Sequence, residues 1–368
     1  MPRLLFVSKP LGPPWNDSSK NLVRDLALGL TRYDAVAFGR ARDAGRLGRA
    51  QIEPLHPDTR GGFSPGLREN GRVLARLLTG ERCAAWHFFF APNPKTSGAA
   101  RAAARLRRAR TVQTVCSVPS DGAELSRVLF GDRVVVLSKH TEKRFLDAGI
   151  ARERLVRIAP AVPPLATPGE AERARFRAAH GISAEAPLLV YPGDLEFGEG
   201  ARLVLDAHEK LAPNVELALA CRPKTPAARA KEAALRERAS ALGTARRVHF
   251  IGETPEILTL VATADMVLLP STVAYAKMDY PLVLLEAMAL ARPVLVAENT
   301  PAAELAEGGA ALAVPATLDA VAEQATRLLA NDDARRTLGA AALATARADF
   351  SRERMAGAYE LLYDGLLS

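Results

Sequence analysis

The feature that most constrains the fold is a repeated alternation of short apolar runs with longer segments of helical spacing. Leu4–Ser8 leads into Pro and Gly residues, as a buried parallel strand would, and Leu22, Leu26 and Leu30 then share one helical face. Strands that alternate with helices predict an α/β fold on a parallel sheet. The other strand-like runs of the first half are Ala35–Phe38, Ala85–Phe90, Thr111–Val115 and Val134–Leu137.

The alternation is interrupted once, at residues 159–169, which read APAVPPLATPG. A Pro-dense stretch of this kind is typical of a linker. We therefore expect two domains, 1–160 and 161–351, with a C-terminal helix at 352–368 that packs back onto the first. The strand-like runs of the second half are Leu188–Tyr191, Val215–Ala220, Val248–Ile251, Met266–Leu269 and Val294–Val296.

The charge is distributed unevenly between the two halves. Residues 1–160 hold 28 Lys and Arg against 14 Asp and Glu, whereas residues 161–368 hold 21 against 27. The basic half favours a phosphate-rich or otherwise anionic partner. Nucleic acid is not expected, because no zinc-finger, RNA-recognition or basic-zipper pattern accompanies the charge. The basic run 101–110 is either a solvated helix or a peripheral contact with an anionic membrane.

The sequence also predicts where the protein works. No stretch approaches the ~20 apolar residues of a membrane-spanning helix, and the N-terminus lacks the apolar core of a signal peptide. Cys83, Cys116 and Cys221 are odd in number and far apart, which indicates reduced thiols. We expect a cytoplasmic protein, with peripheral contact at the inner membrane face as a further expectation.

The most specific motif is Pro281-Leu-Val-Leu-Leu-Glu-Ala-Met-Ala followed by Arg292-Pro-Val. With it, the sequence resembles the retaining glycosyltransferases of family 4, which have the GT-B fold. Ser8–Asn16, Asp132–Ser138 and His249–Glu253 resemble other segments of that family. The resemblance implies two doubly wound Rossmann-like domains that face each other across a cleft. The second would hold a nucleotide sugar, and the first a hydroxyl acceptor such as a glycan, lipid or natural product.

The helix that begins near Pro281 and Leu282 carries the donor-side candidates. Free N–H groups at a helix start attract phosphate. In the resembled family, a Glu at position 286 is the second of an E-x7-E pair and binds ribose; alternatively, Glu286 only complements the helix dipole. The first Glu of the pair would fall at Met278.

The residues on either side of Met278 are further candidates. Asp279 either contacts the donor sugar in its place or caps the following helix. Lys277 is a candidate for the diphosphate.

A second departure from the family concerns the diphosphate. The family has Gly-Arg-Leu-x-x-x-Lys-Gly where this chain begins at Gly193, so that Asp194 and Glu199 replace the Arg and Lys. Carboxylates beside a diphosphate would repel it. Arg222 and Lys224, at the end of the next strand, are the candidate replacements, unless they belong to an ordinary basic surface loop.

No metal or further cofactor is expected beside the nucleotide sugar. The reason is that the sequence offers no Asp-x-Asp dyad near these elements.

One more donor-side candidate, Gly12, and the acceptor-side candidates Trp15, Asn16, Asn93 and Ser117 follow the strands of the first domain. Gly12 would let the backbone approach the donor phosphate. Trp15 offers either a flat face for a sugar or a hydrophobic plug. Asn16 and Asn93 would face the cleft, and Ser117 would supply a hydroxyl beside Cys116, which stands where the family often has His.

The resulting hypothesis is a retaining, metal-independent hexosyltransferase. Family chemistry is thought to be front-face, with the donor phosphate helping to deprotonate the acceptor hydroxyl, so no protein nucleophile is required. The alternatives are a catalytically silent GT-B protein that binds a glycan or a partner, and a sugar-nucleotide epimerase. The substituted residues Asp194, Glu199, Met278 and Cys116 favour the silent protein.

Overall fold

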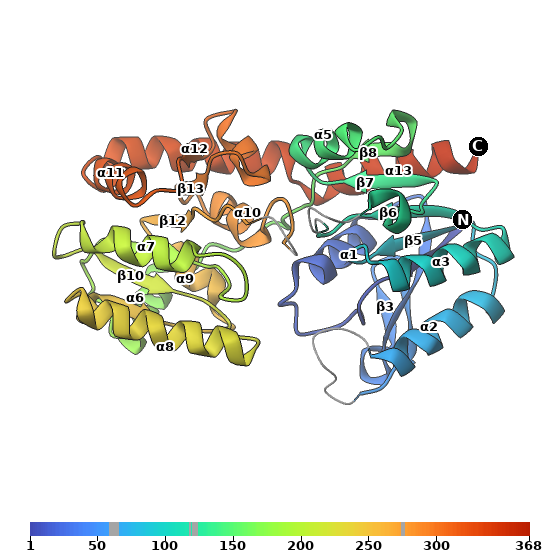
Figure 1. Cartoon of the computed structure of the whole chain (residues 1–368), viewed down its shortest axis with the longest axis horizontal. Coiled ribbons are helices and arrows are strands. Elements are labelled where there is room, and N and C mark those ends of the chain that lie inside the picture. Colours follow the sequence, from blue (N-terminus) through green and yellow to red (C-terminus); the bar gives the residue numbers. More distant parts are fainter. Residues whose placement is uncertain (59–65, 118, 120–123, 274–276) are drawn as a thin grey trace. The chain divides into compact units, whose positions relative to one another are not determined.

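The computed structural model describes residues 1–58, 66–117, 119, 124–273 and 277–368. The chain forms two compact units (Figure 1). Unit 1 comprises Met1–Pro163, Ala274–Leu282 and Phe350–Ser368, and unit 2 comprises Pro164–Val273 and Val283–Asp349. The segment that carries Asp279 therefore belongs to unit 1, although unit 2 precedes and follows it in the chain.

Unit 1 is built on an eight-stranded sheet of order β3-β4-β2-β1-β5-β6-β7-β8. Neighbouring strands are parallel except β3 and β4, which form an antiparallel edge. The strand order reverses between β1 and β5, and ligands of such sheets bind beyond the carboxyl ends of strands at this switch point. The strands are β1 (Arg3–Val7), β2 (Asp34–Arg40), β3 (Gly45–Leu47), β4 (Ala50–His56), β5 (Ala85–Phe89), β6 (Arg110–Thr114), β7 (Arg133–Val136) and β8 (Leu155–Arg157).

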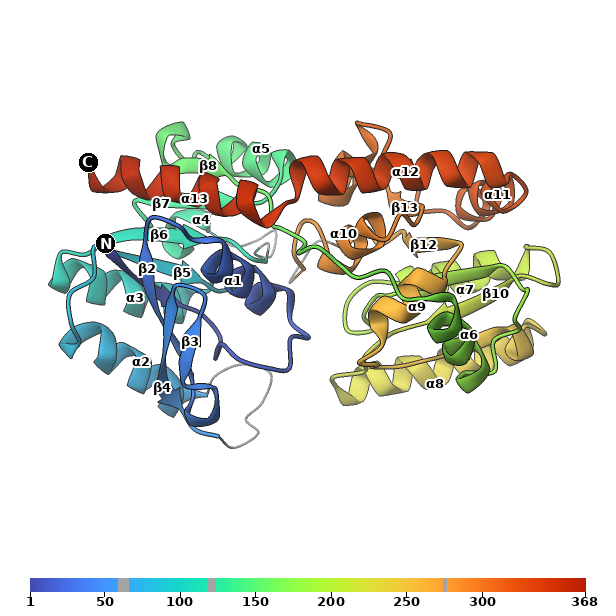
Figure 2. The ribbon, with the colours of Figure 1, turned by 180° about the vertical axis from the view of Figure 1, so that it is seen from behind.

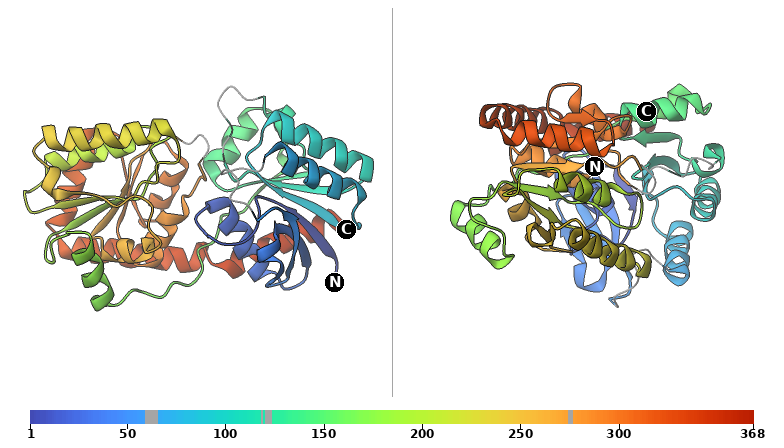
Figure 3. Two further views of the ribbon diagram at one scale, coloured as in Figure 1. Left: turned by 90° about the horizontal axis from the view of Figure 1, so that it is seen from below. Right: turned by 60° about the vertical axis from the view of Figure 1, so that its left-hand side comes forward.

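Helices cover both faces of this sheet. In the left view of Figure 3, α2 and α3 lie on one face, and α1 and α13 on the other. Figure 2 shows α13, the last helix of the chain, beside α1. The helical elements are α1 (Ser18–Gly29), η1 (Ala41–Asp43), α2 (Leu67–Thr79), α3 (Pro94–Arg107), α4 (Leu125–Val128), α5 (Lys139–Asp147), η2 (Arg152–Arg154) and α13 (Arg352–Leu367).

The face of the sheet beneath α13 contains a buried polar chain. His87 Nδ1 lies 2.6 Å from Tyr363 Oη and His87 Nε2 lies 2.7 Å from Thr114 Oγ1, which is 3.0 Å from Tyr359 Oη. Burial lowers the pKa of His87 far enough to keep the ring neutral. The position of α13 is therefore fixed by specific hydrogen bonds as well as by apolar packing.

Glu360 adds a second attachment of α13. Its carboxylate accepts hydrogen bonds from the backbone N–H groups of Thr31 and Arg32, both at 2.6 Å, and from Thr31 Oγ1 at 2.9 Å. These groups follow the end of α1, so one buried side chain joins the last helix of the chain to the first.

Unit 2 is built on a six-stranded parallel sheet of order β11-β10-β9-β12-β13-β14. Its order reverses between β9 and β12, which places its switch point there. The strands are β9 (Leu188–Tyr191), β10 (Glu216–Leu219), β11 (Val248–Phe250), β12 (Met266–Leu269), β13 (Val294–Ala297) and β14 (Leu312–Val314).

The helices of unit 2 pack in neighbouring pairs. Helix α7 contacts α8 and α11, and α6 contacts α9. They are α6 (Glu170–Ala179), α7 (Gly200–Glu209), α8 (Pro226–Ala241), η3 (Ala245–Arg247), α9 (Ile257–Thr263), α10 (Leu282–Ala289), η4 (Pro301–Ala306), α11 (Leu318–Leu329) and α12 (Asp332–Asp349).

The two doubly wound α/β sheets confirm the predicted fold class, with the antiparallel strand β3 as an addition. The three cysteines all lie in the described part of the chain, and none forms a disulfide. Across the described helices, none is both long enough and apolar enough to traverse a bilayer.

Candidate functional site

The donor-side candidates gather at the carboxyl ends of three adjacent strands of unit 2. The loop 193–199 follows β9, Arg222 and Lys224 follow β10, and Glu253 follows β11. These loops are joined by direct bonds: Lys224 N donates to Glu196 Oε1 at 2.7 Å, and Arg222 Nη1 lies 2.9 Å from Glu253 Oε1. The fold thus brings the predicted loops to one edge, with Arg222 already engaged by a carboxylate.

The two acidic replacements in the first loop have local partners. Asp194 Oδ1 accepts from Phe197 N at 3.2 Å and so stabilises the turn of the loop. Glu199 Oε1 lies 3.3 Å from Lys231 Nζ on α8. These contacts offset part of the repulsion that the two carboxylates would exert on a bound diphosphate.

Gly193 has a packing role that the sequence did not reveal. A Cβ at Gly193 would lie 2.3 Å from ring carbons of Tyr191, and one at Gly200 would lie 2.7 Å from Tyr191 Oη. Tyr191 is fully buried, and burial raises the pKa of its phenol well above the ordinary value. Both glycines are therefore required by the Tyr191 side chain, independently of any ligand.

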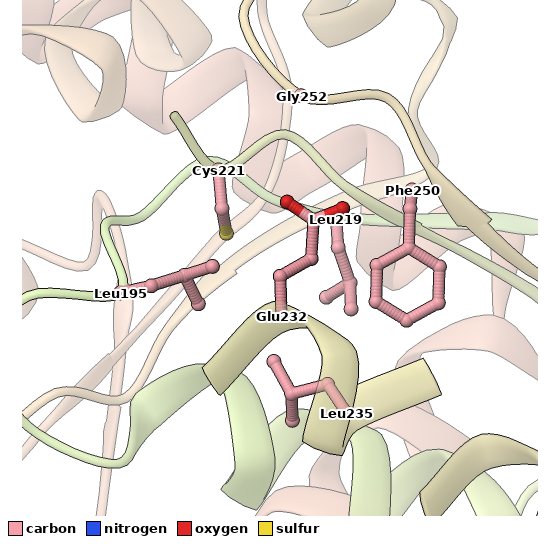
Figure 4. Close-up of a pocket in the computed structure, with 7 residues that line it drawn as sticks. All are labelled: Leu195, Leu219, Cys221, Glu232, Leu235, Phe250 and Gly252. Carbon is pink, nitrogen blue, oxygen red and sulfur yellow. The ribbon is translucent and has the colours of Figure 1, made fainter. Parts of the chain in front are cut away.

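A small cavity lies beneath these loops (Figure 4). Glu232 points from α8 into it, and Arg236 Nη2 donates to Glu232 Oε1 at 2.7 Å. One acid in an otherwise apolar lining makes this cavity unsuitable for a phosphate. Its lining residues are Leu195, Leu219, Cys221, Glu232, Leu235, Phe250 and Gly252.

A second hollow lies between α7 and α8 and gathers the cations Arg202, Lys231 and Arg238. Each of them has an acidic neighbour. Asp206 lies 2.9 Å from Arg238 Nε and 3.6 Å from Arg202 Nε, while Lys231 pairs with Glu199. The three cations are at least two-fifths exposed, which is typical of a solvated surface network.

Helix α10 carries Glu286 on its partly exposed side. The residues Leu284, Leu285, Ala287 and Met288 are fully buried, whereas Glu286 is half-buried. The helix begins at Leu282, directly after the half-buried Pro281. A carboxylate in the second turn of a helix behind a switch-point strand is accessible to a ligand at that edge.

Asp279 lies in unit 1, with its carboxylate at the start of α5. Ser138 Oγ donates to Asp279 Oδ2 at 2.6 Å, and the same hydroxyl caps α5 by accepting from Thr141 N at 3.0 Å. Met278 and Asp279 are both 7% exposed, and Lys277 is half-buried. One oxygen of Asp279 is thus used in holding its segment to unit 1.

The acceptor-side loop follows β1 at the switch point of unit 1. Asp17 caps α1 by accepting from Lys20 N at 3.1 Å, and its other oxygen lies 2.6 Å from Lys9 Nζ. Burial opposes ionisation of Asp17, but Lys9, Ser19 and the Lys20 N–H outweigh it and lower the pKa of Asp17. Gly12 has φ +155°, and a Cβ there would lie 2.3 Å from the Asp43 carboxyl group. Asp43 therefore takes the space that we expected Gly12 to leave for a phosphate.

Two cationic side chains lie against the indole ring of Trp15. Lys20 Nζ and Arg24 Cζ lie 5.4 and 5.3 Å from its ring centroid, within cation–π range. Asn16 beside it is exposed.

The remaining acceptor-side candidates follow β5 and β6. Asn93 caps α3, because its Oδ1 accepts from Thr96 N at 3.0 Å. Ser117 is half-buried next to Cys116, which is buried. Burial raises the pKa of the Cys116 thiol to about 12, so this thiol stays protonated.

The basic run 101–110 is partly used inside unit 1. Arg101 Nη2 donates to the carbonyls of Ser126 and Arg127, and Arg107 Nη2 donates to Gly80 O at 2.6 Å. Arg110 donates to Leu366 O of α13. Arg105 and Arg108 are exposed and are the members of the run that a partner would meet.

Sequence reasoning missed four residues of these edges: Lys9, Asp43, Ser138 and Tyr191. The contacts of Asp43 and Ser138 join segments that are distant along the chain, so no local sequence pattern predicts them. Lys9 and Tyr191 contact residues that are near in the chain, but their residue types alone do not indicate these contacts. The described residues contain no group of three or more His, Cys, Asp or Glu side chains that would hold a metal ion.

The sequence pattern of the family described as glycosyl transferases group 1 matches residues 172–345, which span the sheet and site loops of unit 2. Residues 172–345 therefore belong to this family. A search of curated proteins finds no significant relative. The family's domain lies on the unit that holds Glu286, Arg222 and Lys224.

Solved structures of low sequence identity share the fold of this glycosyltransferase over the whole chain. HepE of Anabaena, solved with UDP and glucose, has a TM-score of 0.79 and 18% identity, covering 99% of this chain and 100% of its own. Sucrose-phosphate synthase of Thermosynechococcus elongatus has a TM-score of 0.74 and 19% identity, covering 99% of both chains. WaaG, a glycosyltransferase involved in lipopolysaccharide biosynthesis, has a TM-score of 0.68 and 16% identity, covering 99% of both.

Proposed function

We propose that this protein transfers a hexose, with retention of configuration, from a nucleoside diphosphate sugar to an acceptor hydroxyl. The observation that carries the proposal is made at the carboxyl ends of the unit 2 strands. Within the segment that matches the family, three loops at these strand ends are joined by the Glu196–Lys224 and Arg222–Glu253 contacts. HepE has been solved with UDP-glucose, which makes UDP-glucose the first donor to test.

In this proposal the donor is held mainly by unit 2. Glu286 accepts hydrogen bonds from the ribose hydroxyls, and the start of α10 at Pro281 and Leu282 faces the phosphates. Arg222 and Lys224 neutralise the diphosphate as the sugar leaves, aided by Lys277. Asp279 contacts the donor sugar.

The acceptor is held by unit 1, at Trp15 and Asn16 in the loop after β1 and at Asn93 and Ser117. The donor phosphate takes the proton from the attacking hydroxyl, so no protein nucleophile takes part. Arg222 and Lys224 supply the positive charge that the lost Arg and Lys of the Gly193 loop would have supplied, and no metal is required.

The test is nucleotide release from UDP-, GDP-, ADP- and dTDP-sugars by the full chain. We expect turnover of one donor class, unchanged by EDTA. The double variant Arg222→Ala/Lys224→Ala should lower it at least about ten-fold, since a hydrogen bond to a charged group contributes about 1.5–3 kcal/mol. Arg246→Ala is the control, because Arg246 is exposed in the same unit. Turnover that the double variant leaves unchanged would contradict the assigned roles.

A silent binding protein is the second candidate. It is favoured by Asp194 and Glu199, which stand in place of cations, and by the ion pair of Arg222 with Glu253. Nucleotide binding without turnover of any donor in the panel would establish this alternative.

We also propose that Arg105 and Arg108 contact anionic lipid. Full-length protein should co-sediment with phosphatidylglycerol vesicles, and the binding should weaken as salt rises. Arg105→Gln/Arg108→Gln should reduce it, whereas Arg246→Gln should not. Binding that does not respond to salt, or no binding, would end this proposal.

A further inference from the structure

The ends of β1 and β2 in unit 1 hold a charge cluster whose groups are only partly paired. It consists of Lys9, Lys20 and Arg40 with Asp17 and Asp43. Lys9 and Asp17 form the direct ion pair of the cluster, at 2.6 Å. Of the other three groups, Lys20 has a neutral partner, Asp43 has a distant one, and the guanidinium of Arg40 has none among the described residues.

Asp43 is the least satisfied member. Its side chain is 7% exposed, and Arg42 Nε lies 3.9 Å from Oδ1, beyond hydrogen-bond distance. Its Oδ2 is buried and accepts no hydrogen bond from the described residues. A buried carboxylate oxygen without a donor is costly, and a hydroxyl group would remove that cost.

Asp43 also lies at the functional edge of the sheet. Gly12 lies in the loop after β1, and a Cβ on it would lie 2.3 Å from Oδ2 of Asp43. Because β1 borders the switch point, this is where a ligand of unit 1 would bind. The unsatisfied oxygen is therefore found at the expected site rather than in the core.

The two cations complete the cluster. Lys20 is 9% exposed, and its Nζ donates to a neutral acceptor, Pro14 O, at 2.9 Å. Burial lowers the pKa of Lys20, and the neighbouring charges that act on it are Asp17, Arg40, Asp43 and Lys9. Arg40, at the end of β2, is half-buried, and its guanidinium forms no hydrogen bond or ion pair with the described residues.

We propose that this cluster binds an acidic sugar as the acceptor: Asp43 Oδ2 accepts from a sugar hydroxyl, and Lys20 and Arg40 bind its phosphate or carboxylate. The proposal rests on the proposed function, since it names the acceptor class of the same transferase. One ligand of this chemistry satisfies the bare oxygen and both cations at once. A neutral sugar satisfies only Asp43, and an inorganic anion satisfies only the cations.

The test is calorimetric titration of the full chain with glucose 6-phosphate, glucuronate, glucose and inorganic phosphate. We expect at least one of the two acidic sugars to bind about ten-fold or more tightly than both glucose and phosphate, as expected for an added charge-assisted contact. The comparison between phosphate and carboxylate tells which anionic group the cations prefer. Equal binding of glucose and both acidic sugars, tightest binding of phosphate alone, or no binding of either acidic sugar at millimolar concentration would overturn the proposal.

Two variants separate the parts of the cluster. Arg40→Gln should remove most of the preference for the acidic sugar over glucose, and Arg46→Gln, on the exposed edge strand β3, is its matched control. Asp43→Asn should weaken the acidic sugar but leave inorganic phosphate binding unchanged. If neither variant alters acidic-sugar binding, the ligand lies elsewhere and the assignment is wrong.

Nucleotide binding provides the independent readout. A chain that binds UDP or consumes a donor yet shows no preference for acidic sugars contradicts this inference alone. A chain that prefers acidic sugars but binds no nucleotide contradicts the proposed donor function instead. Circular dichroism of each variant confirms that the fold is retained.

Discussion

At the carboxyl end of each sheet, glycines make room for a side chain of the same unit, but the side chain differs between the two units. In unit 2, Gly193 and Gly200 make room for the ring and hydroxyl of Tyr191, a neutral and fully buried side chain. In unit 1, Gly12 makes room for Asp43, whose buried Oδ2 lacks a hydrogen bond from the described residues. The first arrangement is complete without a ligand, whereas the second leaves a polar group for a ligand to satisfy.

The two strand ends also differ in how their cations are paired: the cations of unit 2 face carboxylates, whereas a cation of unit 1 does not. The unit 2 loops pair Arg222 with Glu253 and Lys231 with Glu199. In the unit 1 cluster, Lys20 relies on a neutral carbonyl. The comparison teaches that a glycine in a family motif does not by itself mark a phosphate site, because a side chain of the same unit can require it.

The largest expected effect concerns the attachment of α13 to unit 1. Glu360→Ala leaves the N–H groups of Thr31 and Arg32 without their acceptor, and we expect a loss of about 3 kcal/mol in the free energy of unfolding. Urea denaturation followed by tryptophan fluorescence measures it, because both tryptophans, Trp15 and Trp86, lie in unit 1. Glu353→Ala, on the exposed first turn of α13, is the control. A change equal to the control would show that the attachment adds nothing.

The next effect belongs to unit 2. Gly193→Ala would force a methyl group against Tyr191, and overpacking of this kind costs about 1–3 kcal/mol. Circular dichroism in urea should show an earlier transition, while tryptophan fluorescence from unit 1 stays unchanged. Gly308→Ala is the control, since its Cβ would meet no neighbouring atom. Equal stability of the two variants would remove the packing explanation for Gly193.

A smaller effect tests whether Asn93 is a helix cap or an acceptor contact. Asn93→Ala should destabilise unit 1 by about 1 kcal/mol, because α3 loses its N-cap. Asn93→Asp retains the cap and should restore the stability. If Asn93→Asp is stable but impairs transfer, the amide contacts the acceptor; if transfer is unchanged, Asn93 acts as a cap alone.

The smallest effect is a pH dependence. Burial opposes ionisation of Glu360, but the N–H groups of Arg32 and Thr31 outweigh it and lower the pKa of this carboxyl below its ordinary value. Its stabilisation is thus complete above the unfolded-state pKa and is lost as pH falls through the folded-state pKa. The stability difference between the wild type and Glu360→Gln should shrink on acidification. A difference that is constant or grows in acid would contradict the assignment.

Much of the fold was predictable because the central strands are buried on both faces and therefore read as apolar runs, as in Leu188–Tyr191 and Met266–Leu269, which match β9 and β12. Strand β4 was missed because AQIEPLH alternates polar residues and contains Pro54, and β14 because it is only three residues long. Strand β14 is also the edge of its sheet, where one side meets solvent or a loop and the apolar pattern is weaker; β4 lies inside its sheet, between β3 and β2.

The candidate site was predictable only where one local segment decides it. The loop positions of Arg222 and Lys224 follow from the end of the strand-like run Val215–Ala220, which contains β10. The bond between Ser138 and Asp279 joins residues 141 positions apart, and the approach of Asp43 to Gly12 depends on how β2 leads into η1. Such contacts arise from tertiary packing, which no spacing in the sequence records.

The most direct test of the central claim is a calorimetric titration of the full chain with UDP, GDP, ADP and dTDP, each compared with its nucleoside. The account predicts that one diphosphate binds well above its nucleoside, and that Arg222→Ala/Lys224→Ala reduces its affinity to the nucleoside level. Equal binding of nucleoside and diphosphate, or diphosphate binding that the double variant does not change, would contradict the claim that unit 2 holds a nucleotide sugar through these two cations.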